Sequence, residues 1–100
     1  MSSKTFNITD RSRPKVVALS QDNVAVSTIA TITISAALDG YTPVGIVGLT
    51  VVNASSSGAY SSFCFPYMFF LNEDGEAEIH LRNTYSSAAK VQVTAYLLYI

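Results

Sequence analysis

Apolar and polar side chains alternate with a period of two along much of this chain, and this pattern constrains the fold more than any other feature. The alternation is cleanest in segment 76–82, where one side carries Ala77, Ile79 and Leu81, and the other carries Glu76, Glu78, His80 and Arg82. Successive side chains of a β-strand point to opposite faces, so this pattern predicts a half-buried strand.

The rest of the chain also consists of strand-like segments joined by turn residues. The predicted strands are 15–20, 24–38, 44–53, 63–71, 76–82 and 89–100. Asp39-Gly40, the run 54–58, Asn72–Gly75 and the run 83–88 are turns or loops, because Gly, Asn, Asp and Ser favour them. Since no convincing amphipathic helix is present, we expect an all-β protein. Its predicted architecture is an antiparallel β-sandwich, jelly-roll-like or immunoglobulin-like, which is expected to be oligomeric.

Length and charge exclude several classes of protein. One hundred residues suffice for one domain, and 13% charged with 49% hydrophobic residues is too apolar for a disordered chain. A net charge of -1 argues against nucleic acid as a partner. The apolar runs are too short for a membrane-spanning helix, and the N-terminus has no signal-peptide core.

Cysteine and histidine occur once each, as Cys64 and His80. This excludes a disulfide within the chain, a multi-cysteine zinc site and a two-histidine metal site. Cys64 lies among Phe63, Phe65 and Pro66 and is expected in the core, while His80 is expected on a polar sheet face. Four acidic residues lie close together in the sequence: Glu73, Asp74, Glu76 and Glu78. We interpret them as residues that keep a hairpin turn soluble rather than as a calcium site. We therefore expect no catalytic residues, no metal and no cofactor.

The first fourteen residues are mostly polar and end at Pro14. They form either a frayed end or an arm that docks on a neighbouring subunit. Residues 15–100 are expected to form the single β-sandwich domain.

Several predicted strands are apolar on both faces, which an ordinary two-layer sandwich does not require. Examples are 63–71, 44–52 and the end of the last strand. A second copy of the chain is the simplest cover for the extra apolar face, although a third layer or the N-terminal arm would also serve. We expect a homo-oligomer with an interface formed by Phe63, Phe65, Tyr67, Phe69, Tyr96, Leu98 and Ile100.

Three short motifs resemble a known family. They are Gly40–Gly48 (GYTPVGIVG), Ala77–Thr84 (with RNT at its end) and Ala89–Ile100 (with VTAYLLY). The series, which covers about residues 30–100, resembles the C-terminal domains of tail, fibre and minor structural proteins of phages and prophages. The resemblance implies a non-enzymatic virion component, often trimeric, assembled in the host bacterial cytoplasm. Members of this family usually form the C-terminal end of a much longer protein. A chain that begins at Met1 therefore favours a small capsid-decoration or head-fibre subunit, or an excised piece.

Two other functions are weighed against a structural role. A receptor- or carbohydrate-binding domain at a fibre tip would use loop tyrosines, and Tyr60 and Tyr85 are the candidates for contact with a cell-surface glycan. Interface and rim packing is the alternative reading of the same tyrosines. An enzyme such as a glycan hydrolase ranks last, because the carboxylates crowd into one hairpin.

Overall fold

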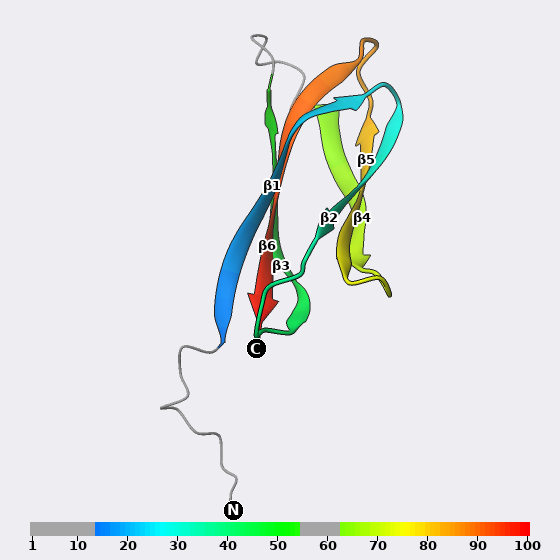
Figure 1. Ribbon diagram of the computed structural model, residues 1–100. Helices are drawn as coiled ribbons and strands as arrows, with labels where there is room; N and C mark the ends of the chain where they lie inside the picture. The colour runs from blue at the N-terminus through cyan, green and yellow to red at the C-terminus, as the bar shows by residue number, and fades with distance from the viewer. Residues whose placement is uncertain (1–13, 55–62) are drawn as a thin grey trace, which may run out of the picture.

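A computed structural model describes residues 14–54 and 63–100, and these form six strands (Figure 1). Their bounds are β1 Lys15–Val26, β2 Ile29–Ser35, β3 Pro43–Asn53, β4 Cys64–Leu71, β5 Glu76–Asn83 and β6 Ala89–Tyr99. All four strand pairings are antiparallel. The predicted all-β class is confirmed, and the architecture is that of a small β-sandwich.

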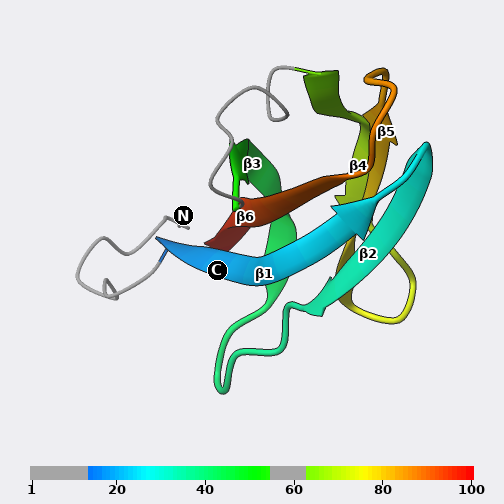
Figure 2. The same ribbon diagram turned by 90° about the horizontal axis from the view of Figure 1, so that it is seen from above.

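Two three-stranded sheets pack against each other (Figure 2). The strand orders are β1-β6-β3 and β2-β5-β4, so β6 and β5 are central and the other four strands are edges. The N-terminal arm predicted for residues 1–14 lies outside the described residues except for Pro14, which is exposed.

The two central strands supply most of the core. Every inward side chain of the predicted alternation in β5 and β6 is 0% exposed: Ala77, Ile79, Leu81, Val91, Val93, Ala95 and Leu97. Each central strand is covered by a neighbour on both edges and by the opposite sheet on its inner face. The period-two pattern is therefore confirmed where the burial is most complete.

The prediction of one strand over residues 24–38 is wrong. Residues 24–26 continue β1, which pairs with β6, and the chain then turns at residues 27–28 and enters the other sheet as β2. A bulge between Gln21 and Val24, with Asn23 at φ 55°, joins the two halves of β1. The chain must change sheets here because both Val26 and Ile32 face the same core from opposite sides.

The turn residues behave as their chemistry predicts. Gly40 and Gly75 have φ values of 80° and 77°, in the left-handed region that glycine adopts without strain. The Asn72 side-chain oxygen accepts hydrogen bonds from the backbone N–H of Asp74 and of Glu76, both at 3.0 Å. These bonds close the β4–β5 hairpin and fix its antiparallel pairing.

A buried hydrogen bond connects the two sheets. The Tyr99 hydroxyl, at the end of β6, donates to the carbonyl oxygen of Ala36 just after β2, at 2.8 Å. The backbone N–H of Ala36 in turn donates to Gly75 in the β4–β5 turn at 3.1 Å. Since Lys15 pairs with Tyr99, these contacts place the start of β1 at the same end of the sandwich as that turn.

Candidate functional site: two exposed apolar surfaces

Edge strand β4 exposes five large apolar side chains in nearly unbroken succession. The exposed fractions are 43% for Phe65, 49% for Tyr67, 46% for Met68, 45% for Phe69 and 40% for Phe70. We call these five residues the β4 surface. Aromatic side chains bury 150–250 Å² when covered, so the five expose about 400 Å² of mainly apolar area. An apolar area of this size is within the range of the largest patch on a protein surface, which is often functional.

A bulge in β4 distributes these side chains over two directions. The register with β5 shifts between Pro66 and Met68. Beyond the shift, Met68 and Phe70 lie opposite His80 and Glu78 on the outer side, whereas Phe69 lies opposite the buried Ile79. Simple alternation would place Phe65, Tyr67 and Phe69 on one side, so the sequence reading missed Met68 and Phe70. Phe69 stays exposed because β4 is an edge strand.

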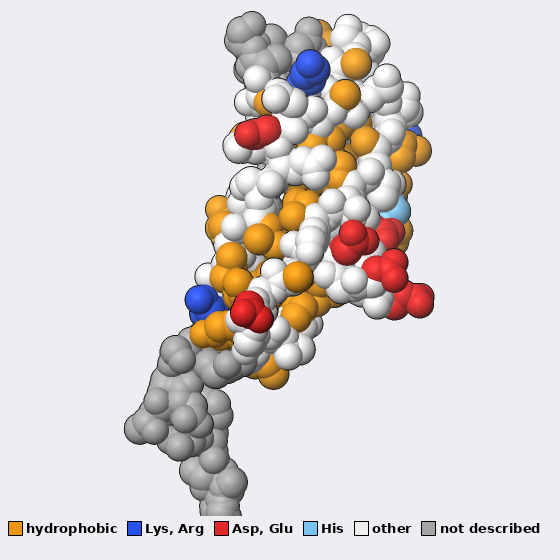
Figure 3. Space-filling view, viewed as in Figure 1, with side chains coloured by type: hydrophobic (Ala, Val, Ile, Leu, Met, Phe, Trp, Pro, Cys, Tyr) orange, Lys and Arg blue, Asp and Glu red, His pale blue; other side chains and the backbone are white. Residues whose placement is uncertain are grey.

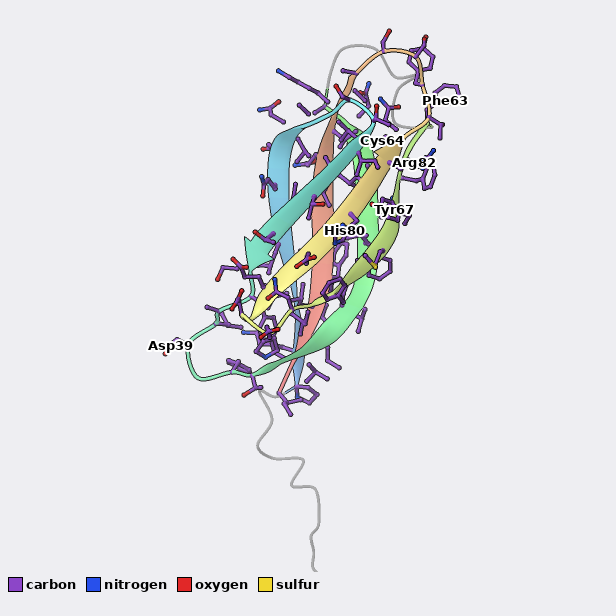
Figure 4. The ribbon with its side chains drawn as sticks, turned by 90° about the vertical axis from the view of Figure 1, so that its right-hand side faces the viewer. Asp39, Phe63, Cys64, Tyr67, His80 and Arg82 are labelled. Atoms are coloured by element: carbon purple, nitrogen blue, oxygen red, sulfur yellow. The ribbon has the colours of Figure 1, made fainter. Side chains whose placement is uncertain are left out.

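The outer side of β5 contributes a polar row beside the β4 surface. The His80 imidazole lies 3.1 Å from the Thr31 hydroxyl through Nδ1 and 2.7 Å from the Glu78 carboxylate through Nε2. The rings of Phe70 and Tyr67 lie 6.1 and 5.9 Å from the His80 ring, centre to centre. Figure 4 shows Tyr67 and His80 close together on neighbouring strands.

This row holds a hydroxyl, an imidazole and a carboxylate, and hydrogen bonds join the imidazole to the other two groups. The Asn72 side-chain amide also donates to Glu78 at 3.2 Å. These bonds hold His80 in place, and the hydrogen bonds from Asn72 and then His80 lower the pKa of Glu78.

The outer face of the β1-β6-β3 sheet forms a second apolar surface. The register places Val16 beside Leu98, and Ala18 beside Tyr96, on this outer side. We call the residues Val16, Ala18, Tyr96, Leu98 and Ile100 the sheet face. Val16 is 55%, Tyr96 36% and Ile100 54% exposed. These outward positions carry no charge.

Two glycines of β3 lie beside the sheet face. Gly45 pairs with Leu98, and Gly48 pairs with Tyr96. A Cβ added at Gly48 would lie 3.3 Å from the Tyr96 ring, so the ring covers the glycine backbone. An apolar face with an aromatic ring along it suits contact with another apolar surface.

The other predicted site residues fall into different environments. Phe63 precedes β4, is 39% exposed, and its ring lies 4.9 Å from the Tyr85 ring. Tyr85 is thus engaged with Phe63 at one rim, and Tyr60 lies outside the described residues. Cys64 is 3% exposed, as expected of a core residue, and burial raises the pKa of its thiol.

Most acidic side chains of the described residues lie toward one end of the sandwich (Figure 3). Figure 3 shows acidic side chains on the side of the β4–β5 hairpin, and a basic group at a similar height on the opposite side. Among residues 14–54 and 63–100, no three His, Cys, Asp or Glu side chains are placed to hold a metal ion. The same residues include no helix long and apolar enough to cross a membrane.

The fold defines the chain as a small antiparallel β-sandwich with two exposed apolar surfaces. Comparison with known proteins adds no relative: no protein-family profile, curated protein or solved structure matches this chain. The resemblance to phage domains therefore rests on the three sequence motifs alone.

Proposed function

We propose that this protein is a non-enzymatic structural module of a bacteriophage virion, part of a fibre, a tail or the capsid surface, that assembles as a homo-oligomer. The observation that supports self-association is the β4 surface, where five large apolar side chains of one strand are each 40–49% exposed. The virion context is supported by the motifs at residues 40–48, 77–84 and 89–100.

The magnitude of the exposed area favours self-association. At about 25 cal/mol per Å², burying about 400 Å² contributes on the order of 10 kcal/mol before the costs of association. Those costs are about 4–15 kcal/mol, so the β4 surface offsets them only when the partner also buries apolar area. Another copy of the chain offers apolar area of this kind, and most soluble oligomers are formed by copies of one chain.

Light scattering on the full chain tests the self-association. The expected result is a trimer of three times 10.7 kDa, about 32 kDa, because the resembled domains are often trimeric. A monomer of 10.7 kDa at tens of micromolar protein refutes the self-association. Recovery of the protein on purified phage particles, lost when residues 1–14 are deleted, tests the virion role and the arm as its attachment.

A receptor- or glycan-binding domain is the alternative proposal. Its candidate contacts are Tyr60 and Tyr85, and Tyr85 packs against Phe63 at the rim while 37% exposed. Saturable binding on a glycan array that is lost in both Tyr60→Ala and Tyr85→Ala would favour this function. The absence of any glycan signal, together with binding to particles, would favour the structural role.

A further inference from the structure

We infer that the β4 surface of one copy packs on the sheet face of the next copy, so that the subunits associate head to tail through two different surfaces. This inference rests on the proposed self-association and specifies its geometry. The β4 surface belongs to sheet β2-β5-β4, and the sheet face belongs to sheet β1-β6-β3. A single kind of contact between the two surfaces covers both.

Pairing of each surface with itself needs two kinds of contact. Two β4 surfaces joined about a two-fold axis would leave Val16, Tyr96 and Ile100 of each copy uncovered, at 36–55% exposure. A head-to-tail contact leaves neither surface uncovered when the subunits close into a ring. The ring therefore hides more apolar area per subunit with one interface.

The combined area matches a specific interface. The β4 surface exposes about 400 Å², and the sheet face roughly 300 Å² on the same scale. Apolar atoms form about 57% of a typical interface, so about 700 Å² of apolar area corresponds to about 1,200 Å² in total. Specific protein interfaces begin at about this size.

Pro66 favours contact through side chains over extension of the sheet. The N–H of Thr84 donates to the carbonyl of Phe63, so residue 63 points its backbone groups toward β5. Backbone groups alternate in direction along an antiparallel strand, which directs the backbone of Pro66 to the free edge of β4. Proline lacks an N–H, and a new strand added along this edge would lose a hydrogen bond there.

Charges at one end determine the relative orientation of neighbouring copies. Lys15 borders the sheet face beside Val16 and shares its end of the sandwich with the exposed Asp39, while Glu73 and Asp74 lie exposed in the turn that follows β4. The Tyr99–Ala36–Gly75 contacts place these opposite charges at the same end of the sandwich. At the other end the β1-β6-β3 sheet carries both Asp22 and Lys90, which offset each other. Packing with the Lys15 end on the acidic turn brings unlike charges together.

Two single variants and their mixture test the inference. Ala18→Glu places a charge on the sheet face, and Tyr67→Glu places one on the β4 surface; both sites are exposed. Each variant alone is expected to be monomeric, because every head-to-tail contact needs both surfaces. An equimolar mixture is expected to form a heterodimer of twice 10.7 kDa, about 21 kDa, through the one intact pair of surfaces.

Ile29→Glu is the matched control, since Ile29 is 56% exposed on β2, outside both surfaces, and pairs with Arg82. It is expected to keep the wild-type mass. Circular dichroism and a thermal transition check that each variant folds. As a second variant, Lys15→Glu is expected to weaken the affinity between subunits about threefold or more. The triple variant Lys15→Glu, Glu73→Lys and Asp74→Lys is expected to restore that affinity.

The outcomes separate this inference from the proposed function. An oligomeric wild type with Ala18→Glu still fully assembled shows self-pairing of β4 and overturns the head-to-tail contact alone. Assembly of Tyr67→Glu at wild-type mass overturns it as well, as does a mixture that stays monomeric while both variants are folded. A monomeric wild type instead refutes the proposed self-association.

Discussion

Replacement of Asn83 by alanine is expected to destabilise the domain more than any exposed substitution. Asn83 ends β5 and is 4% exposed, which makes it the one buried polar residue in the described part of the chain. Its side-chain amide donates to the carbonyls of Val26 at 3.0 Å, Ser27 at 3.3 Å and Ser87 at 2.9 Å. Its side-chain oxygen accepts from the N–H of Tyr85 at 2.9 Å.

The magnitude follows from what each partner does after Asn83→Ala. The amide has two hydrogens, so the Val26 and Ser27 carbonyls share one of them. Three hydrogen bonds at about 1 kcal/mol each then give an upper value of about 3 kcal/mol. Ser87 and Tyr85 are exposed residues whose backbone groups can bond to water, whereas Val26 is 0% exposed. The expected loss in the free energy of unfolding is therefore about 2–3 kcal/mol. For a domain of this size, that corresponds to a fall in Tm of about 10–20 °C.

Equilibrium unfolding in urea, followed by circular dichroism at one fixed protein concentration, measures the loss. Gln21→Ala is the matched control, since it removes an amide from an exposed position in β1 and is expected to change stability by less than about 0.5 kcal/mol. If Asn83→Ala unfolds within about 0.5 kcal/mol of this control, the assigned role of the Asn83 hydrogen bonds is wrong.

Three further predictions concern single groups. Tyr99→Phe removes the hydroxyl that bonds across the sheets and should lower the free energy of unfolding by about 1 kcal/mol in the same urea assay. The pKa of Glu78 is lowered, by hydrogen bonds from Asn72 and then His80. The carboxylate therefore stabilises the fold above the usual glutamate pKa, and this stabilisation is lost as pH falls through the lowered value. Glu78→Gln should reduce the difference in stability between pH 7 and pH 3; an unchanged difference contradicts this. Burial raises the pKa of Cys64, so a thiol reagent should label it rapidly only in denaturant; equally fast native labelling contradicts its burial.

The central strands could be predicted from sequence because their environment is complete. Ala77, Ile79 and Leu81 alternate with polar residues, and one face of β5 is wholly buried. The last strand behaves in the same way, since the inward residues of β6 are also 0% exposed. Where one face is dry and the other is not, hydrophobic spacing specifies the strand and its orientation.

Edges and sheet changes could not be predicted in this way. The run 24–38 is uniformly rich in β-branched residues, so nothing local marks the passage from β1 to β2 at residues 27–28. The β4 bulge at Tyr67 likewise leaves no periodic signal, because the residues on both sides of it are apolar. Asn83 resembles an ordinary loop residue until Val26, distant in the chain, presents its carbonyl.

Three properties of this protein follow from the order of its residues. It is built of strands, most strands begin and end where the local pattern places them, and its apolar side chains exceed the needs of one small core. Local spacing encodes these properties, because alternate side chains of a strand point to opposite faces. The tertiary structure alone decided which apolar residues remain outside. Exposure depends on whether a strand is central or at an edge, and that position is set by pairing between segments far apart in the chain.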